Sequence, residues 1–173
     1  MTFLPVVILA IDPGAVAGWA IFRAGVLVRS GSARTVHERE VVVCQAVAVA
    51  ADAGCPLVVV AETWRPMKSH VTMLGMGAAW GLWLAELQRC GVPARRILRV
   101  VPEVWRKACY GTARVPREEA KPKAIDFVAR CYRTEAGPDE AEAICIGAWG
   151  SEAEAELRFA LGVQALRALG VAA

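Results

Sequence analysis

The 173-residue sequence lacks the features that define several large classes of protein. Although 56% of its residues are hydrophobic, no charge-free stretch approaches the ~20 apolar residues that cross a bilayer. No Lys or Arg precedes Arg23, and Asp12 interrupts the first apolar run, so we expect no signal peptide. There is no internal repeat and no linker-like stretch, which favours one domain over residues 1–173.

The cysteines form no CxxC pair, which argues against a zinc site and against a disulfide framework. All six stand singly, at positions 44, 55, 90, 109, 131 and 145. Isolated cysteines are typical of small buried side chains in a reducing compartment. We therefore expect a cytoplasmic protein with no membrane partner.

Lysine is scarce, and most of it lies in one basic segment. The net charge is only +3, but residues 89–133 hold twelve Lys or Arg against four Asp or Glu, a net +8. The candidate contacts in this segment are Arg106, Lys107, Arg114, Lys121 and Lys123. A local basic block of this kind is typical of a polyanion partner such as DNA. A solvated, arginine-rich surface is the alternative.

Apolar patterning predicts an alternation of strands and helices. We expect strands at 6–12, 18–23, 26–30, 57–62 and 97–101, and helices at 37–53, 70–90, 103–109, 121–133, 139–149 and 152–169. Pro122 sets the start at 121, because proline fits a first turn and breaks a helix interior. Ser151 and Glu154, with the spacing of a capping box, start the last helix. The small residues Gly75, Gly77, Ala78, Ala79 and Gly81 are expected to let the 70–90 helix approach the sheet closely. The order indicates a three-layer α/β fold with a mixed sheet.

Two of the buried-type strands end on a carboxylate, Asp12 and Glu62. The ends of parallel strands are where open α/β sheets place ligands. If the two strands are parallel neighbours, these residues lie roughly 5 Å apart. Carboxylates that close resist ionising unless a cation lies between them. Asp12-Pro13-Gly14 can also be read as a turn signal and nothing more.

A further acidic group lies at residues 139–142, at the start of an expected helix. Asp139 and Glu142 are three positions apart and share a face, whereas Glu140 points about 100° away. Acids in a first turn can merely complement the helix dipole, and we prefer this interpretation for Glu140. Hard oxygen ligands on strand ends and on one helix face suit Mg²⁺ or Mn²⁺, and two such ions can hydrolyse a phosphodiester. With the basic block, the acids predict a metal-dependent nuclease.

Several short motifs follow one another between about residues 6 and 149. They are Ile11-Asp12-Pro13-Gly14 with Gly18-Trp19-Ala20, Val60-Ala61-Glu62, Val101-Pro102 leading to Trp105-Arg106-Lys107 and Gly111, Lys121, and Asp139-Glu140-Ala141-Glu142-Ala143-Ile144. The combination resembles the RuvC family of Holliday junction resolvases, within the RNase H-like (retroviral integrase) superfamily. The motifs look closer to its phage or prophage members than to the standard bacterial enzyme.

The resemblance implies an RNase H-like α/β fold, with a mixed five-stranded sheet flanked by helices. It also implies a catalytic, metal-binding tetrad of Asp12, Glu62, Asp139 and Glu142, with two Mg²⁺ or Mn²⁺ ions per active site. Lys107 and Lys121 match basic positions near the DNA backbone. The family acts as a homodimer that nicks opposed strands of a four-way junction and leaves 5′-phosphates. Glu142 departs from the pattern, since Asp is commoner there, and the longer side chain could shift the preference toward Mn²⁺.

The loop after Glu62 is a second candidate DNA contact. Trp64, Met67 and Lys68 lie in it, and an apolar or aromatic wedge there could stack on an unpaired base. Core packing is the alternative for Trp64, and core or dimer interface are the alternatives for Trp80 and Trp83.

Three other functions stay open. One is a relaxed nuclease that also cuts flaps and forks, as phage resolvases often do. Another is a non-catalytic junction-binding module, although four acids would weaken its binding to a polyanion. The third is the sugar kinase and actin-like ATPase group, which needs two such domains, whereas 173 residues hold one.

Overall fold

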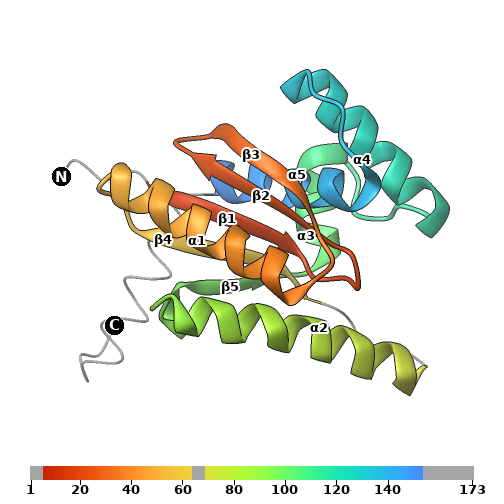
Figure 1. Cartoon of the computed structure of the whole chain (residues 1–173). Helices are drawn as coiled ribbons and strands as arrows, with labels where there is room; N and C mark the ends of the chain where they lie inside the picture. Colours follow the sequence, from red (N-terminus) through yellow and green to blue (C-terminus); the bar gives the residue numbers. More distant parts are fainter. Residues whose placement is uncertain (1–5, 64–68, 154–173) are drawn as a thin grey trace, which may run out of the picture.

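The computed structural model describes residues 6–63 and 69–153, and its strands form one five-stranded sheet (Figure 1). The strands are β1 (Val7–Asp12), β2 (Ala17–Arg23), β3 (Val26–Ala33), β4 (Leu57–Glu62) and β5 (Ile97–Val100), in the spatial order β3-β2-β1-β4-β5. The helices are α1 (Val36–Asp52), α2 (His70–Arg89), α3 (Pro102–Tyr110), α4 (Arg117–Tyr132) and α5 (Pro138–Glu152), with a 3₁₀ turn η1 (Ala94–Arg96) before β5.

β1 is the central strand because its residues are apolar on both faces. Val7 to Ile11 are all 2% exposed or less, as expected for a strand covered on both sides. β1 pairs antiparallel with β2 and parallel with β4, and β4 pairs parallel with β5. Ala24 and Gly25 both have positive φ in the tight turn that joins β2 to β3. The predicted mixed five-stranded sheet is confirmed.

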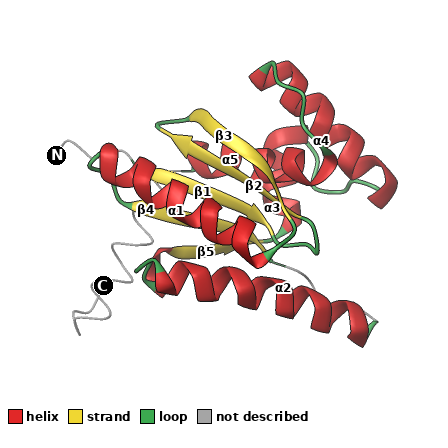
Figure 2. Cartoon of the chain, in the orientation of Figure 1, coloured by secondary structure: helices red, strands yellow, loops and turns green. Residues whose placement is uncertain are grey.

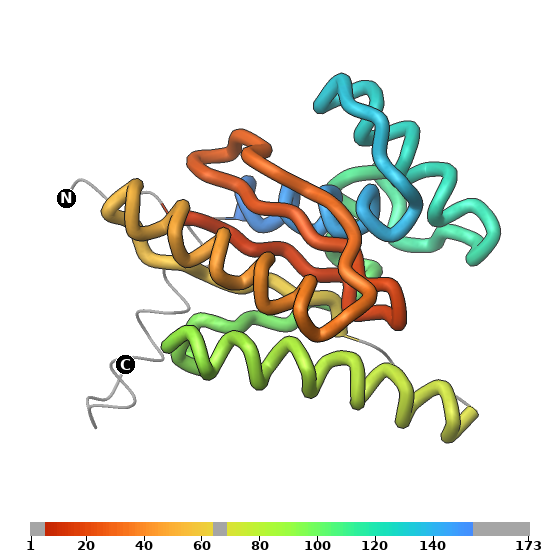
Figure 3. The backbone as a smooth tube through the Cα atoms, viewed as in Figure 1, coloured from red at the N-terminus to blue at the C-terminus, as the bar shows by residue number. Residues whose placement is uncertain are grey.

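Helices cover both faces of the sheet and produce three layers (Figure 2). On one face, α1 and α2 pack over Leu9, Ile11 and Val59. On the other face, α3, α4 and α5 pack over Ile8 and Phe22. The backbone trace shows α5, near the end of the described chain, lying along β1 and β2 from its beginning (Figure 3). Residues more than 120 positions apart can therefore meet at one end of the sheet.

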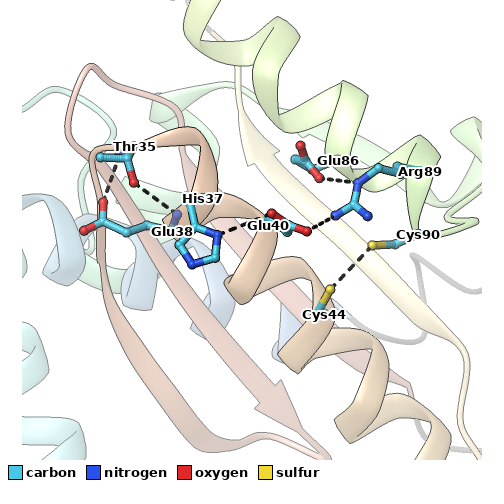
Figure 4. A network of polar contacts seen from close by, with 8 residues as sticks. All are labelled: Thr35, His37, Glu38, Glu40, Cys44, Glu86, Arg89 and Cys90. Carbon is cyan, nitrogen blue, oxygen red and sulfur yellow. Dashed lines mark hydrogen bonds and ion pairs between the residues drawn. The ribbon is translucent and has the colours of Figure 1, made fainter.

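Polar contacts tie α1 to α2 at the edge of their shared core (Figure 4). Arg89 of α2 donates from Nε to Glu86 at 2.8 Å and from Nη2 to Glu40 of α1 at 2.7 Å. The thiols of Cys44 and Cys90 share a hydrogen bond with 3.9 Å between their sulfur atoms and form no disulfide. The expectation that the cysteines are buried is wrong for most of them, since only Cys145 is buried.

The predicted start of α4 is wrong by four residues. The helix begins at Arg117, and Pro122 lies inside it. Glu118 and Glu119 in the first turn favour a helix start there, because they complement the helix dipole. Pro122 removes the hydrogen bond to the carbonyl of Glu118, which is exposed and can bond to water instead.

The predicted start of the last helix is also wrong. Ser151 is part of α5, and its Oγ donates to the Gly147 carbonyl at 2.9 Å, a bond made within a continuing helix. The expected helix 152–169 lies outside the described residues from position 154 onward.

α2 is anchored by large side chains and not by its glycines. A Cβ added at Gly75, Gly77 or Gly81 would meet no described atom within 4 Å, so the predicted close packing is wrong for the glycines. Of the five small residues, Ala79 is buried. The buried side chains of α2 are Ala79, Trp80, Trp83 and Leu87, which places both tryptophans in the core. Among the described helices, none combines the length and the apolar character that a bilayer span requires.

Candidate active site at the ends of the central strands

Asp12 and Glu62 lie at the same edge of the sheet. β1 and β4 run in parallel, and Ile11 pairs with Ala61. Asp12 and Glu62 are the next residues along each strand, so they end adjacent strands at the same edge, as predicted. After Asp12 the chain turns at once, and the Gly14 amide donates to the Asp12 carbonyl at 3.0 Å. This turn keeps Asp12 at the lip of the sheet, partly exposed, with an apolar strand behind it.

α5 brings two more carboxylates to this edge. Asp139 is in its first turn, and Glu142, one turn later, is only 8% exposed. α5 can approach this closely because Gly18 of β2 has no side chain: a Cβ there would lie 1.8 Å from the Asp139 carbonyl oxygen. Carboxylate oxygens of Asp12, Asp139 and Glu142 all lie within 4.8 Å of one another. The structure thus brings three of the four predicted metal ligands together.

Glu62 lies beside this group of three and not inside it. Its Oε2 accepts a 2.8 Å hydrogen bond from the indole Nε1 of Trp105 on α3. Its charge still acts on Asp12 and is affected by Glu142, so the four acids form one electrostatic system. Trp105 belongs to a motif already noted in the sequence, but no local pattern connects it with Glu62.

Glu140 lies in the first turn of α5, where its charge complements the helix dipole as predicted, and it also makes hydrogen bonds there. Its Oε2 accepts from the Gly137 amide at 3.3 Å, which completes the capping interaction of α5. Its Oε1 accepts from Ser30 Oγ at 2.7 Å and so joins the helix to β3. Glu140 therefore holds α5 in place, while its neighbours Asp139 and Glu142 face the strand ends.

Burial and repulsion between like charges raise the pKa values of Asp12, Glu62 and Glu142. Burial is the largest cause for Asp12, whose pKa lies well above its usual value, and the charges of Glu62, Glu142 and Asp139 raise it further. Burial also raises the pKa of Glu62 to about 7, against the lowering effect of the Trp105 hydrogen bond. The pKa of Glu142 is raised by burial as well. Such a site gains most from a bound cation, because the cation removes the penalty of ionising every acid.

Two basic side chains offset part of the negative charge. Lys121 Nζ lies 2.7 Å from Asp139 Oδ1, and this hydrogen bond is the main cause of the raised pKa of Lys121. Arg106 Nη2 lies 3.6 Å from Glu142 Oε1. The positive charges of Lys121 and Arg106 do not balance the four carboxylates, so the site remains acidic. Hard-oxygen donors at this density fit Mg²⁺ or Mn²⁺.

A cleft of about 830 Å³ opens beside the acids and carries both signs of charge. Glu62 and Glu142 line it together with the basic residues Arg106, Arg117 and Lys121. Arg117 was missed by the sequence analysis, although it lies in the basic block. A second hollow of about 660 Å³ is lined by Arg106 and Arg114.

Among the described residues, the other predicted DNA contacts do not line the cleft. Lys107 is exposed on α3, and Lys123 pairs with Glu119 one turn earlier on α4, at 2.9 Å. Trp64, Met67 and Lys68 lie outside the described residues.

Comparison with known proteins establishes the fold. No protein-family model matches the sequence, and no curated protein sequence matches it. Among solved structures, the chain is similar to Thermus thermophilus RuvC in complex with a Holliday junction substrate, with a TM-score of 0.60 and 18% identity over 84% of this chain and 93% of that one. A second Thermus thermophilus RuvC structure gives a TM-score of 0.62 and 17% identity over 87% of this chain and 96% of that one. The chain therefore has the RNase H-like fold of RuvC, as its sequence predicted.

Proposed function

We propose that this chain is a divalent-metal-dependent endodeoxyribonuclease that resolves four-way DNA junctions. The observation that carries the proposal is the gathering of Asp12, Asp139 and Glu142 within 4.8 Å, with Glu62 on the adjacent strand. This acidic edge is part of a fold shared with a RuvC whose structure includes a Holliday junction substrate. The sequence motifs point the same way.

The acids would hold two Mg²⁺ or Mn²⁺ ions. Asp12 is central to this role, since it lies between Glu62 on β4 and the pair on α5. Bound divalent ions can activate a water and stabilise the leaving oxygen of a phosphodiester. The residues of the chain present oxygen ligands on rigid strand and helix ends. Lys121 restrains Asp139, and Arg106 lies against Glu142.

The basic side chains around the cleft would receive the DNA backbone. Arg106, Lys121 and Arg117 line the cleft next to the acids, so a phosphate there would reach both a cation and the proposed metal ligands. The more peripheral candidates are Lys107, Arg114 and Lys123, with Met67 and Lys68 outside the described residues. A contiguous basic surface beside an acidic centre is what a nuclease requires, since the acids alone would repel DNA.

A homodimer is part of the proposal, because two opposed nicks need two active sites. The surface that supports it is the exposed side of α2, where Val71 and Leu74 are 81% and 75% exposed. The glycines of α2 add no side chain that would hinder a second copy. The expected outcome is a concentration-dependent dimer in sedimentation experiments that Leu74→Glu weakens. We place the protein in the cytoplasm, in keeping with its six free cysteines.

The test is a cleavage assay on a synthetic four-way junction with Mg²⁺ or Mn²⁺ and mapped cut positions. Wild-type protein should give symmetric paired nicks with 5′-phosphates. Asp12→Asn should abolish cleavage and leave junction binding intact or tighter. Asp52→Asn is the matched control, because Asp52 is exposed at the end of α1, and it should cut normally. Full activity of Asp12→Asn would exclude the proposed centre.

Parallel substrates separate this function from its alternatives. Equal cleavage of junctions, flaps and forks would indicate a relaxed debranching nuclease built on the same site. Junction binding without cleavage of any branched substrate in either metal would indicate a non-catalytic binding module.

A further inference from the structure

We infer that Trp105 is a positioning residue for the proposed metal centre: its indole N–H holds the carboxylate of Glu62 in the orientation that ligates metal. The inference rests on the proposed function, because it assigns Glu62 to the same centre. It adds a residue that never touches metal or DNA and acts only through Glu62.

The contact itself is well defined. Trp105 is fully buried, and its Nε1 lies 2.8 Å from Glu62 Oε2, a short distance for an N–H donor to a carboxylate. Indole nitrogen is a donor only, so Trp105 cannot itself be a ligand. The bond engages one carboxylate oxygen, and no hydrogen bond between described residues engages the other. Glu62 is thus held by one oxygen, with its second oxygen left for a metal.

The indole is held rigidly enough to position its partner. Tyr110 packs edge-on against it, with ring centroids 5.7 Å apart and an interplanar angle of 79°. The guanidinium of Arg106 lies 5.1 Å from its ring centroid on α3, and the same guanidinium reaches Glu142. Trp105 and Arg106 are consecutive residues, so α3 supports a carboxylate on β4 and another on α5. Restraint of this kind matters most for Glu62, because it lies outside the close group of three acids.

The simpler explanation is that Glu62 only satisfies a buried indole. Trp83 argues against it. That residue is also fully buried, in the core beneath α2, and its Nε1 has no hydrogen-bond partner among the described residues. The fold therefore accepts an unpaired buried indole, so burial alone does not require the Trp105 bond.

The test compares Trp105→Phe with Trp83→Phe by Mn²⁺ binding, using calorimetry and electron paramagnetic resonance. Each variant loses one buried indole N–H, but only the first removes a bond to Glu62. Trp105→Phe should weaken Mn²⁺ binding by about 10- to 100-fold, the usual effect of losing a partner that orients a metal ligand. Trp83→Phe should bind Mn²⁺ as wild type does. In cleavage assays, Trp105→Phe should need correspondingly more Mn²⁺ for half-maximal activity and regain most of the wild-type plateau at saturation.

A second measurement, which keeps Trp105 in place, covers the case in which Trp105→Phe does not fold. In ¹H–¹⁵N spectra of the metal-free protein, one indole resonance should lie well downfield and should move upfield in Glu62→Gln, because an amide is the weaker acceptor. Mg²⁺ should shift that resonance in wild type, and Trp83→Phe should leave it in place.

The outcomes distinguish the two claims. Equal Mn²⁺ affinities for Trp105→Phe and wild type, or no indole resonance that responds to Glu62→Gln, would overturn the inference alone. Absence of Mn²⁺ binding by wild type would overturn the proposed metal centre and the inference with it.

Discussion

Replacing Glu62 with glutamine should stabilise the metal-free protein at high pH and hardly change it at low pH. Glutamine keeps the shape of the side chain and an oxygen that can accept from Trp105. It removes a charge that the folded protein accommodates poorly, since burial raises the pKa of Glu62 to about 7 from its ordinary 4.5. The variant therefore isolates the cost of ionising one buried acid.

The sign follows from proton linkage. The folded state binds the Glu62 proton more tightly than the unfolded chain does. Protonation of Glu62 therefore contributes to the free energy of unfolding, and this contribution is fully present below pH 4.5. This stabilising contribution is lost as the pH rises through about 7. With a pKa of 4.5 in the unfolded chain and about 7 in the folded protein, ionisation of Glu62 lowers the free energy of unfolding by about 0.8 kcal/mol at pH 5. At pH 8 the same free energy is lowered by about 3 kcal/mol. Glu62→Gln should recover most of the loss at pH 8, and more if relief of Asp12 adds to it.

Urea unfolding in EDTA, followed by tryptophan fluorescence at pH 5 and pH 8, measures the effect. Glu118→Gln, an exposed acid in the first turn of α4, is the control and should stay within about 0.5 kcal/mol of wild type at both pH values. With saturating Mg²⁺ at pH 8 the order should reverse, because ligand binding stabilises wild type more than the variant. Equal stabilities at pH 8 without metal, or an equal gain at pH 5, would refute the reasoning.

Two further predictions concern packing and DNA contact. Gly18→Ala forces a methyl group onto the Asp139 backbone and should destabilise the fold by roughly 1–3 kcal/mol. Gly81→Ala adds a methyl group in open space on α2 and should stabilise the fold by up to about 1 kcal/mol. Thermal unfolding of both variants measures the difference, and similar melting temperatures would contradict the prediction. Charge removal by Lys107→Gln or Lys121→Gln should weaken junction binding and reduce its salt slope by about 1, and an unchanged slope would count against a phosphate contact.

The local elements of the fold could be predicted because each has its own sequence pattern. The apolar run before Asp12 predicts a strand buried on both faces, and the structure shows it as the central strand. The spacing of Asp139 and Glu142 predicts a shared helix face, and both carboxylates lie within 4.8 Å of Asp12. The start of α4 could not be read from Pro122, since one lost hydrogen bond at an exposed helix position is tolerated.

Which residues become partners across elements depends on packing, which no single segment encodes. Gly18 and Gly81 look alike in the sequence, yet one is the contact that admits α5 and the other faces open space. Trp105 and Trp83 are both buried, yet only Trp105 donates to a site carboxylate, 43 positions away on another element. The identities of the acids follow from strand and helix periodicity, which is local. The distances between the acids, the raised pKa values of Asp12, Glu62 and Glu142, and the hydrogen bond from Trp105 to Glu62 arise only when β1, β4, α3 and α5 exclude water together at one edge of the sheet.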